Sequence, residues 1–501
     1  MLNKIAKDWV VDLGLKRSIF SADNIPCEPS SVLVQGSTSL GASFKNSDID
    51  AVLVTPNFIH REDFFGSFVN VLKKHQSIKE LLPIPYAFVP LIKMKVEETC
   101  VDLILSRLNL PYVPCPLMFS EQPEIFYNNV DQYSVHGLSG LHLVQKFHDL
   151  VPDFSLFTDL LKVVKTWASR RLIKDYVYGF PASVAWAVLC AYICMHTGFQ
   201  TSLSDSYLGL LDQTIILAEL MDLQSGAPSR SVGNENLPRP MKRKADATLT
   251  TLVQIFFTYF SHWLWPCPVI LSPIVSVPEL RLYSWQPKNA PLKNYDLMPI
   301  ITPVFPHKNA AYTVRPSTRD IVVKELRRAH NLVRKIIRGE AKWAELFEVY
   351  DLRQDHRHFL KLELAADDYQ ELVRLGGLID SRLRDLANFL EENDYIRSVR
   401  ICKVKERQSV GSPTHWSPGT APTSVSPSAT TVNFCRSWLL GMNIIPAPSS
   451  VDGAQPKREV DITPYLANFY NILHEREANT NFLEKLRASY LAWAEVQSLR
   501  L

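Results

Sequence analysis

The chain of 501 residues lacks the features that mark several large classes of protein. Its eight cysteines include no Cys-x-x-Cys pair and no Cys/His set with the spacing of zinc ligands, which indicates a reducing compartment. Residues 1–17 contain no apolar core of a signal peptide. The longest apolar run, residues 182–195, is too short to cross a bilayer, so it predicts a buried helix and no membrane partner.

A strong excess of charge is also absent. The formal net charge of +3 is too small to indicate a nucleic-acid partner, so only the local distribution of charge can do so. With 46% hydrophobic residues the composition is that of an ordinary globular protein with large cores. The length predicts about three domains of roughly 150 residues each.

The most informative stretch, residues 35–50, contains two closely spaced carboxylates. Asp48 and Asp50 lead into apolar residues 51–54, which predict a buried strand. Side chains two residues apart on a strand share a face, so the two carboxylates project together while Ile49 enters the core. Neighbouring carboxylates repel each other unless one is protonated, both are solvated, or a divalent cation lies between them.

A turn and a third acid extend this pattern. Gly36 and Ser37 follow a predicted strand at residues 31–34, where backbone N–H groups and a hydroxyl can hold phosphate oxygens. Asp102 is the one acid in an apolar strand at residues 101–108, where it is costly unless paired or bound to metal. A solvated strand end and a buried structural aspartate are the alternatives. The combination resembles the nucleotidyltransferase signature shared by DNA polymerase β and nucleotide-adding enzymes.

The first part of the chain, residues 1–130, predicts a small mixed α/β domain. We expect helices at residues 5–20 and 60–75, strands at 31–34, 48–54, 87–94 and 101–108, and a turn near Glu97 and Glu98.

Residues 131–342 predict a helical central domain. We expect helices at residues 157–173, 182–195, 249–265 and 320–338. Residues 197–246 interrupt this pattern, and the part at 224–246 is expected to be disordered. Its basic cluster at 239–244 is a weak signal for nuclear import, because a solvated run of charge explains it equally well.

The predicted helix at residues 320–338 has an almost wholly basic outer face. At about 100° per residue, its basic side chains fall within one sector of roughly 120°, and apolar side chains occupy the opposite side. The basic residues are Lys324, Arg327, Arg328, Arg334, Lys335 and Arg338. A charged outer face suits any surface helix, but a basic one favours a polyanion partner.

Residues 343–501 predict alternating strands and helices beside basic residues, which favours a ferredoxin-like module with a nucleic-acid role. We expect strands at residues 358–364, 396–404, 435–445 and 460–462, and helices at 369–391 and 466–498 with a break near Asn479. A Ser/Pro/Thr-rich segment at 406–431 predicts a loop. The fold class is therefore α+β and multidomain.

Over nearly its whole length the chain resembles canonical eukaryotic poly(A) polymerases, within the DNA polymerase β-like nucleotidyltransferase superfamily. Residues 36–37 and 47–51 are similar to the family signature, as are residues 87–90 and 101–103. More discriminating are residues 263–266, 297–303 and 312–319, which lie outside that signature. The resemblance implies a nucleotidyltransferase domain with a polymerase β-like palm, a helical central domain and an RNA-binding, RRM-like C-terminal domain.

The resemblance also implies the site residues. Asp48, Asp50 and Asp102 would be catalytic and would hold two Mg²⁺ (or Mn²⁺) ions, which activate the RNA 3′-hydroxyl and neutralise the triphosphate. ATP would be contacted by Gly36, Ser37, Ser47, Lys165, Lys174, Gly179 and Val184. Without the resemblance, Lys165 is better interpreted as a surface lysine on an amphipathic helix.

The nucleotide-binding segment departs from the family pattern. An ungapped alignment places Lys174 where the family has a tyrosine, and Tyr176 at a usual asparagine. Ala182 and Ser183 replace glycines, and Ser139 falls at an asparagine of the family. A slip of one residue would give the role of the tyrosine to Tyr176. If the ungapped alignment holds, ATP selectivity or turnover is altered and the metal chemistry is not.

Three functions remain open. The leading one is template-independent transfer of AMP from ATP to RNA 3′ ends with release of pyrophosphate, as in mRNA polyadenylation. Its expected partners are the RNA 3′ end, ATP and cleavage and polyadenylation factors, and the protein is expected to be monomeric and nuclear. The second is a nucleotidyltransferase with relaxed base selectivity. The third is an RNA-binding scaffold, against which the retention of three mutually repelling aspartates argues.

Overall fold

The computed structural model describes most of the chain. The described residues are 1–21, 23–44, 47–87, 89–119, 122, 124–196, 248–286, 296–366, 368–411, 431–446, 459–477 and 482–497. The predictions for residues 197–246, most of the loop at 406–431 and the break near Asn479 lie outside them. No helix in the described ranges is long and apolar enough to cross a membrane.

Contacts divide the chain into two compact units, which are described separately. The first contains Met1–Trp167, Ala182–Tyr312 and Leu326–Trp343. The second contains Ala168–Pro181, Thr313–Glu325 and Ala344–Leu501. The division into three domains at residues 1–130, 131–342 and 343–501 stays a prediction.

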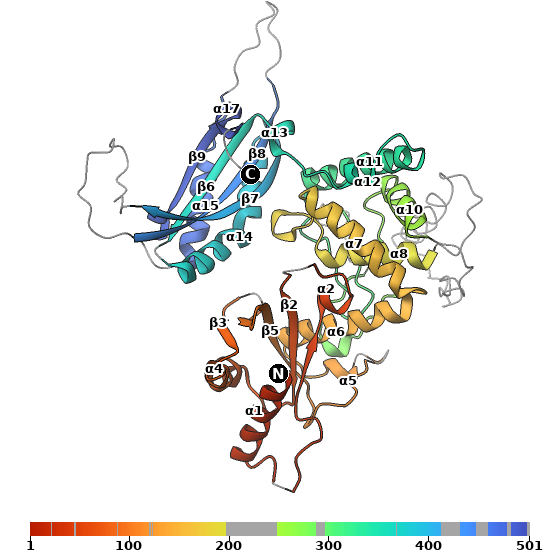
Figure 1. The fold of residues 1–501 in the computed structure, drawn as a ribbon, viewed down its shortest axis with the longest axis vertical. Coiled ribbons are helices and arrows are strands. Elements are labelled where there is room, and N and C mark those ends of the chain that lie inside the picture. Colours follow the sequence, from red (N-terminus) through yellow and green to blue (C-terminus); the bar gives the residue numbers. More distant parts are fainter. Residues whose placement is uncertain are drawn as a thin grey trace, which may run out of the picture. The chain divides into compact units, whose positions relative to one another are not determined.

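A five-stranded sheet organises the first unit, in the order β1-β2-β5-β4-β3 (Figure 1). The strands are β1 (Ser31–Val34), β2 (Ile49–Thr55), β3 (Ile78–Ile84), β4 (Leu91–Val96) and β5 (Thr99–Arg107). β2 and β5 run parallel, and the other neighbours are antiparallel. The sequence did not predict β3, and the strand predicted at 87–94 begins only at Leu91. The predicted turn at Glu97 and Glu98 is confirmed.

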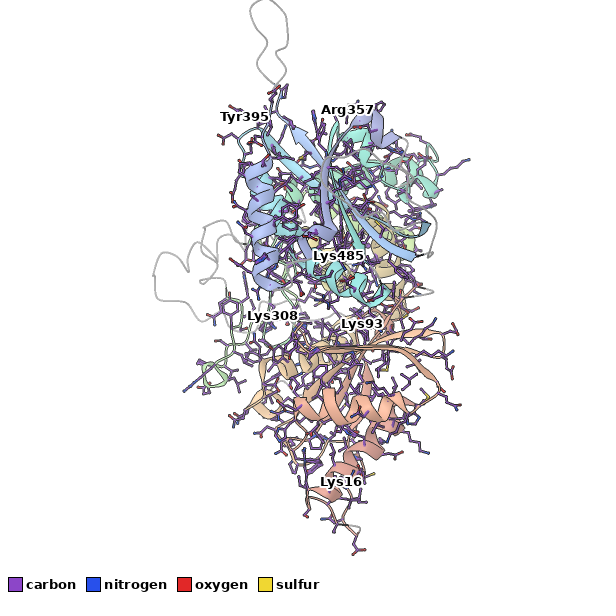
Figure 2. The ribbon with its side chains drawn as sticks, turned by 90° about the vertical axis from the view of Figure 1, so that its left-hand side faces the viewer. Lys16, Lys93, Lys308, Arg357, Tyr395 and Lys485 are labelled. Carbon is purple, nitrogen blue, oxygen red and sulfur yellow. The ribbon has the colours of Figure 1, made fainter. Side chains whose placement is uncertain are left out.

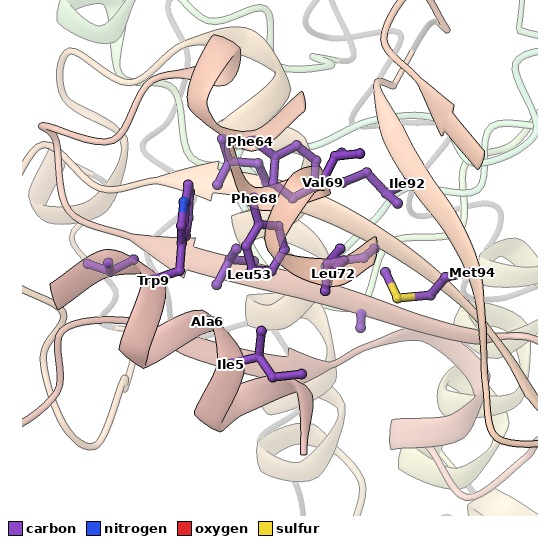
Figure 3. Packing of buried hydrophobic residues seen from close by; sticks show 14 of the residues in the cluster. Ile5, Ala6, Trp9, Leu53, Phe64, Phe68, Val69, Leu72, Ile92 and Met94 are labelled. Carbon is purple, nitrogen blue, oxygen red and sulfur yellow. The ribbon is translucent and has the colours of Figure 1, made fainter. Parts of the chain in front are cut away.

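The two faces of the sheet have separate cores because side chains alternate along β2 and β5. Ala51 and Leu53 face one core, whereas Val52 and Val54 face the other. The first core is closed by α1 (Leu2–Lys16) and by a helical segment that contributes Phe64 and Phe68 (Figure 3). This segment confirms the helix predicted at 60–75, and it consists of α3 (Arg61–Asp63), the π-helix η1 (Phe64–Phe68) and α4 (Val69–Lys73).

Helix α6 (Gln132–Leu150) covers the other face and lies directly on the strands. A Cβ atom at Gly137 would lie 2.1 Å from Ser106 Oγ, so the close approach depends on glycine at this position. Alternation along β5 places Asp102, Ile104 and Ser106 on this same face. The acids therefore share the side of the sheet on which α6 packs.

Helices make up most of the remaining first unit, as the sequence predicts. The elements are α2 (Gly36–Ser39), α5 (Glu124–Tyr127), α8 (Ser183–His196), α10 (Leu249–Ser261) and η3 (Pro278–Leu280). Two further helices are divided between the units: α7 (Phe154–Arg170) belongs to the first unit up to Trp167, and α11 (Pro316–Ile337) from Leu326 on. Trp167 of α7 packs edge-on against Trp186 of α8 and Phe257 of α10, with ring centroids 5.7 and 4.9 Å away. α8 is buried almost throughout, as its apolar sequence predicts.

The second unit is built on a four-stranded antiparallel sheet in the order β7-β8-β6-β9. Its main elements follow one another as β6 (His358–Ala366), α14 (Tyr369–Glu391), β7 (Ile396–Gly411), β8 (Thr431–Ile444), α15 (Thr463–Arg476) and β9 (Leu486–Ala492). This β-α-β-β-α-β connection is that of the ferredoxin-like fold. The smaller helices are η2 (Tyr176–Tyr178), α12 (Trp343–Leu346), α13 (Leu352–Asp355), α16 (Phe482–Lys485) and α17 (Trp493–Gln497).

Two predictions for the C-terminal part are wrong. The helix predicted at residues 466–498 is confirmed by α15 up to Arg476, but Leu486–Ala492 is a strand, because this segment pairs with β6 along its whole length. The strand predicted at 460–462 is irregular backbone that leads into α15. On the sheet, Phe359 and Leu439 are buried together with Leu352 of α13 and Val496 of α17. These residues are therefore not exposed for stacking with bases.

Candidate active site

Two predicted carboxylates lie opposite each other on neighbouring strands. In the parallel pair β2–β5, Asp50 is the register partner of Asp102, so both side chains project from the same face. Asp48 lies one residue before β2, and its negative charge contributes to the electrostatic environment of Asp50. The structure thus brings together the three acids that the sequence singles out.

Gly36 is required by the carboxylate beside it. Its φ of +66° is a conformation that other residues adopt at a cost, and a Cβ atom there would lie 2.7 Å from Asp50 Oδ2. Gln35 N donates to Asp50 O at 2.9 Å, which ties this turn to the start of β2. Glycine is therefore needed at position 36 because it leaves space for the Asp50 carboxylate, which the sequence did not suggest.

Lys93 is a residue of this site that sequence reasoning missed. This residue, labelled in Figure 2, lies on β4 directly opposite Asp102. Its Nζ donates to Asp102 Oδ2 at 2.6 Å. The signal was present in the sequence, because a tight turn at Glu97 and Glu98 fixes the register of this hairpin. The turn places Val96 opposite Thr99. Lys93 lies three residues before Val96, and Asp102 lies three residues after Thr99, so these two residues are paired across the strands.

Lys165 lies close to the acids and is not a surface lysine. The residue is only 5% exposed, and its Nζ donates to Ala42 O at 2.9 Å and lies 5.6 Å from the centroid of the Phe44 ring. Its positive charge acts to lower the pKa of Asp50. The interpretation as a solvated lysine is therefore wrong, because α7 directs this side chain toward the segment between the Gly36 turn and β2.

The Asp50 carboxyl is held closer to its neutral form than an ordinary aspartate. Protein around it partly removes it from water, and this desolvation raises its pKa. The negative charges of Asp102 and Asp48 raise the pKa further, while Lys93 and Lys165 act in the opposite direction. Desolvation and the two neighbouring acids together therefore outweigh the two lysines.

The other predicted nucleotide contacts lie at several places in the fold. Ser37 is in the short helix α2, whose first backbone N–H groups have no acceptor within the helix. Ser47 accepts from Phe44 N at 3.1 Å in the turn before Asp48. Val184 is half-buried near the start of α8. These residues belong to the first unit.

Lys174 and Gly179 belong to the second unit. Lys174 is half-buried in the segment that follows α7. Gly179 has a φ of +85°, and a Cβ atom there would lie 3.0 Å from Arg315 Nε. The backbone conformation and the nearby Arg315 thus explain why residue 179 is a glycine. The nucleotide contacts expected of Lys174 and Gly179 stay predictions.

A divalent cation fits the chemistry of the acids. In the described part of the chain, no three His, Cys, Asp or Glu side chains already form a ligand set for a metal ion. Asp50 and Asp102 nonetheless offer carboxylate oxygens on one face, and Mg²⁺ and Mn²⁺ prefer oxygen ligands. Asp48 directly precedes this pair. The assignment of the three acids as metal ligands stays a prediction that this arrangement supports.

Comparison with protein families explains why these features occur together. Residues 1–151 match the family model described as the poly(A) polymerase nucleotidyltransferase domain. Residues 156–200 and 244–349 match the model of the poly(A) polymerase central domain. The chain belongs to the poly(A) polymerase family. Within this family, the acid cluster lies in the nucleotidyltransferase domain, and Lys165 lies in the central domain.

Curated relatives agree with this family. The chain is 30% identical to poly(A) polymerase pla1 of Schizosaccharomyces pombe over 365 residues, which are 73% of this chain and 56% of that protein. It is 29% identical to poly(A) polymerase PAPalpha of Candida albicans over 361 residues, 72% of this chain and 56% of that protein. The chain therefore spans less than two thirds of the length of these relatives.

Solved structures give a weaker match. A structure of the Cid1 poly(U) polymerase aligns with 70% of this chain and 91% of its own, at 15% identity and a TM-score of 0.41. A cytoplasmic RNA terminal U-transferase aligns with 64% of this chain and 86% of its own, at 15% identity and a TM-score of 0.38.

Proposed function

We propose that the chain transfers AMP from ATP to the 3′-hydroxyl of RNA without a template and releases pyrophosphate. The observation that carries this proposal is the register pairing of Asp50 with Asp102 on one face of the sheet. Gly36 leaves space beside these carboxylates, and membership in the poly(A) polymerase family supports the reaction. The activity needs no covalent nucleophile, because positioning and charge stabilisation provide the catalysis.

Asp48, Asp50 and Asp102 would hold two Mg²⁺ or Mn²⁺ ions. When bound, such ions supply activation of the attacking hydroxyl and neutralisation of the phosphate charge. The residues of the chain prepare this site. Lys93 orients Asp102 through one carboxylate oxygen, so that the other oxygen faces away from the lysine. Lys165 adds a buried positive charge on the side of the Gly36 turn, where it would attract a triphosphate.

The nucleotide contacts follow the family resemblance. Besides Gly36 and Lys165, we propose that Ser37, Ser47, Lys174, Gly179 and Val184 contact ATP. A second candidate function, nucleotidyl transfer with relaxed base selectivity, is favoured by Lys174, Ala182 and Ser183, which depart from the family pattern. A scaffold without activity is disfavoured, because it would have no need for the mutually repelling acids Asp48, Asp50 and Asp102.

The partners and the location of the protein are further proposals. We propose an RNA 3′ end as acceptor, cleavage and polyadenylation factors as partners, a monomeric protein and a nuclear location. The RNA-binding role of the C-terminal module is supported by its ferredoxin-like connection, although Phe359 on its sheet is covered. Any RNA contact by this module would then use other side chains.

Primer extension tests the proposed function. The purified chain is incubated with an oligo(A) primer, Mg²⁺ or Mn²⁺, and each of the four nucleotides in turn. We expect extension with ATP above the others. Equal extension with UTP or CTP would favour relaxed base selectivity, and no extension in any lane would refute both enzymatic proposals.

The variant Asp50→Ala tests the acid cluster. We expect the rate to fall by about a thousandfold or more, because several kcal/mol of charge stabilisation depend on this carboxylate. RNA binding, measured by fluorescence anisotropy, should be almost unchanged. Asp8→Ala is a matched control, since Asp8 is an exposed acid on α1. Activity that survives in Asp50→Ala would show the metal assignment to be wrong.

A further inference from the structure

Helix α11 carries an exposed basic surface that the acid cluster does not use. Three exposed side chains of α11 form it together with Arg338, which directly follows the helix and whose N–H still donates to Arg334 O at 3.3 Å. These four residues, which we name the basic stripe, are Arg327, Arg334, Lys335 and Arg338. The opposite side of the helix is buried through Leu326, Ala329, Val333 and Ile336. All of these residues belong to the first unit. The exposed face of this part of α11, whose ribbon is labelled in Figure 1, is therefore basic in the folded protein as well as in the sequence.

The structure narrows the basic sector that the sequence predicts. Lys324 pairs with Asp355 at 3.4 Å within the second unit. Arg328 is half-buried and has other interactions. Neither residue is part of the basic stripe, so the four remaining positions define the surface.

Among the residues that the structure describes, no acid pairs with the basic stripe. Within the described ranges, none of its four side chains makes a hydrogen bond, an ion pair or a ring contact. The bases of α14 behave differently, since Arg374 pairs with Glu477, and Arg382 with Asp385 at 3.3 Å. Arg334 and Arg338 are four residues apart, and like charges at this spacing destabilise a helix. An unbalanced surface with such a cost indicates an anionic partner.

The spacing of the basic stripe suits a linear polyanion. Arg327, Arg334 and Arg338 lie at positions i, i+7 and i+11, with the polar Asn331 at i+4, so these side chains form one row. The row extends for about 16 Å along the helix axis. Three of the four bases are arginines, whose planar guanidinium groups bind phosphate through two parallel hydrogen bonds. These features favour a chain of phosphates over a single carboxylate.

We propose that the basic stripe binds the phosphates of single-stranded RNA outside the acid cluster. The identity of the RNA rests on the proposed function, because an RNA whose 3′ end is at Asp50 and Asp102 can reach another surface only with its upstream nucleotides. The stripe would thus hold the acceptor while its 3′ end reacts. It adds affinity without base specificity, since phosphate contacts carry no sequence information.

Salt-dependent RNA binding tests this proposal. Fluorescence anisotropy with a labelled single-stranded RNA is measured for the full chain, without nucleotide, between about 50 and 200 mM salt. In Arg334→Glu/Lys335→Glu we expect binding at least about tenfold weaker and a log–log salt slope flatter by about 1.4, which is two phosphate contacts at about 0.7 each. The milder Arg334→Gln/Lys335→Gln should show the same change of slope with a smaller loss of affinity.

A matched control separates the stripe from general charge effects. Lys73 and Lys74 are adjacent exposed lysines of the same unit, at the end of α4, and Lys73→Glu/Lys74→Glu changes the net charge equally. We expect this variant to keep the wild-type salt slope. Equal losses in both double variants would overturn the proposal, as would wild-type binding in the stripe variants. If the stripe variants lost binding to poly-glutamate but kept their binding to RNA, the stripe would bind an acidic protein, and this result would also overturn the RNA proposal.

The outcome is independent of the proposed function. Binding is measured without nucleotide, so the stripe proposal stands if its variants lose RNA while primer extension fails for every nucleotide. If the chain extends primers with ATP and the stripe variants bind RNA as the wild type does, the stripe proposal fails while the proposed function stands.

Discussion

The two units each contain a cluster of like charges, and the clusters have opposite signs. In the first unit, Asp48, Asp50 and Asp102 gather around Lys93 and Lys165. The second cluster contains more positive than negative groups around a single buried glutamate, and its residues are Arg171, Arg400, His356, Glu325 and Tyr350. The comparison shows how a protein treats unbalanced charge in an accessible place and in a buried one.

In the second cluster, one buried carboxylate lies between two arginines. Glu325, only 3% exposed, accepts from Arg171 Nε at 2.9 Å and from Nη2 at 3.1 Å. The guanidinium of Arg400 lies 3.5 Å from the centroid of the Tyr350 ring and 4.0 Å from Glu325. The cluster joins the end of α7, helix α11 and strand β7 within the second unit.

In both clusters a titratable group is shifted toward its neutral form. Burial and then the charge of Arg400 lower the pKa of His356 to about 4. Desolvation and then the charge of Asp102 raise the pKa of Asp50. In the buried cluster, the neutral histidine avoids adding a third positive charge to the two arginines. The acid cluster is exposed at Asp50, so a bound cation can balance its negative charge. This accessibility is expected of charges that bind a ligand, whereas charges that stabilise the fold are paired inside the protein.

The largest effect should come from breaking the buried cluster. Glu325→Ala leaves two buried arginines without their carboxylate, and we expect the free energy of unfolding to fall by about 3–5 kcal/mol. Denaturant unfolding measures this loss. Glu340→Ala, at an exposed glutamate just after α11, should change it by less than about 0.5 kcal/mol. A similar small change in both variants would show that Glu325 does not hold this cluster together.

A pH-dependent effect should follow from His356. The unfolded histidine binds a proton near its ordinary pKa of 6.5, whereas the folded one stays neutral until about pH 4. The unfolded state therefore binds more protons in this window, and stability falls as pH falls through it. We expect His356 to account for a loss of about 3 kcal/mol between these pH values. Denaturant unfolding of wild type and His356→Gln at several pH values in this window measures the effect, and the variant should lack this part of the loss. If the free energy of unfolding falls equally with pH in both proteins, His356 is not its cause.

The smallest effect should come from the acid cluster. Because the folded pKa of Asp50 is raised, the unfolded chain gives up its proton first, and stability falls as pH rises above 3.8. Asp50→Asn removes this fall, so the variant should be more stable at pH 7. The gain should stay below about 1 kcal/mol because solvent screens the exposed carboxylate. Thermal melting at pH 4 and pH 7 measures it, and a variant less stable than wild type at pH 7 would show that the cluster is not strained.

Local sequence was enough where an element carries its own pattern. The helix predicted at residues 369–391 is found as α14 with the same bounds, because its apolar residues recur at helical spacing and Asp368 caps its start. The strand predicted at 31–34 is β1. In contrast, Leu486–Ala492 was predicted as part of a helix, and only its pairing with β6 makes it a strand. Residues of β3 likewise become a strand through pairing with β4.

The candidate site divides in the same way. The acids and the Gly36 turn were predictable, because their residue types and order carry the chemistry. The burial of Lys165 was not, since helical spacing alone placed it among the outer bases of α7, and the contact with Ala42 spans 123 positions of sequence. Arg171, directly after α7, is likewise buried and pairs with Glu325, which is distant in the sequence.

By itself, the sequence determined the family, the identities of the acids and the basic bias of α11, because these depend on residue type and on short spacing. The tertiary structure alone decided which charges meet. It paired Lys93 with Asp102 and directed Lys165 toward the acids, and it left the basic stripe unpartnered within the described residues. The physical reason is that electrostatic energy depends on distance and burial in the folded state, and neither can be read from the order of residues.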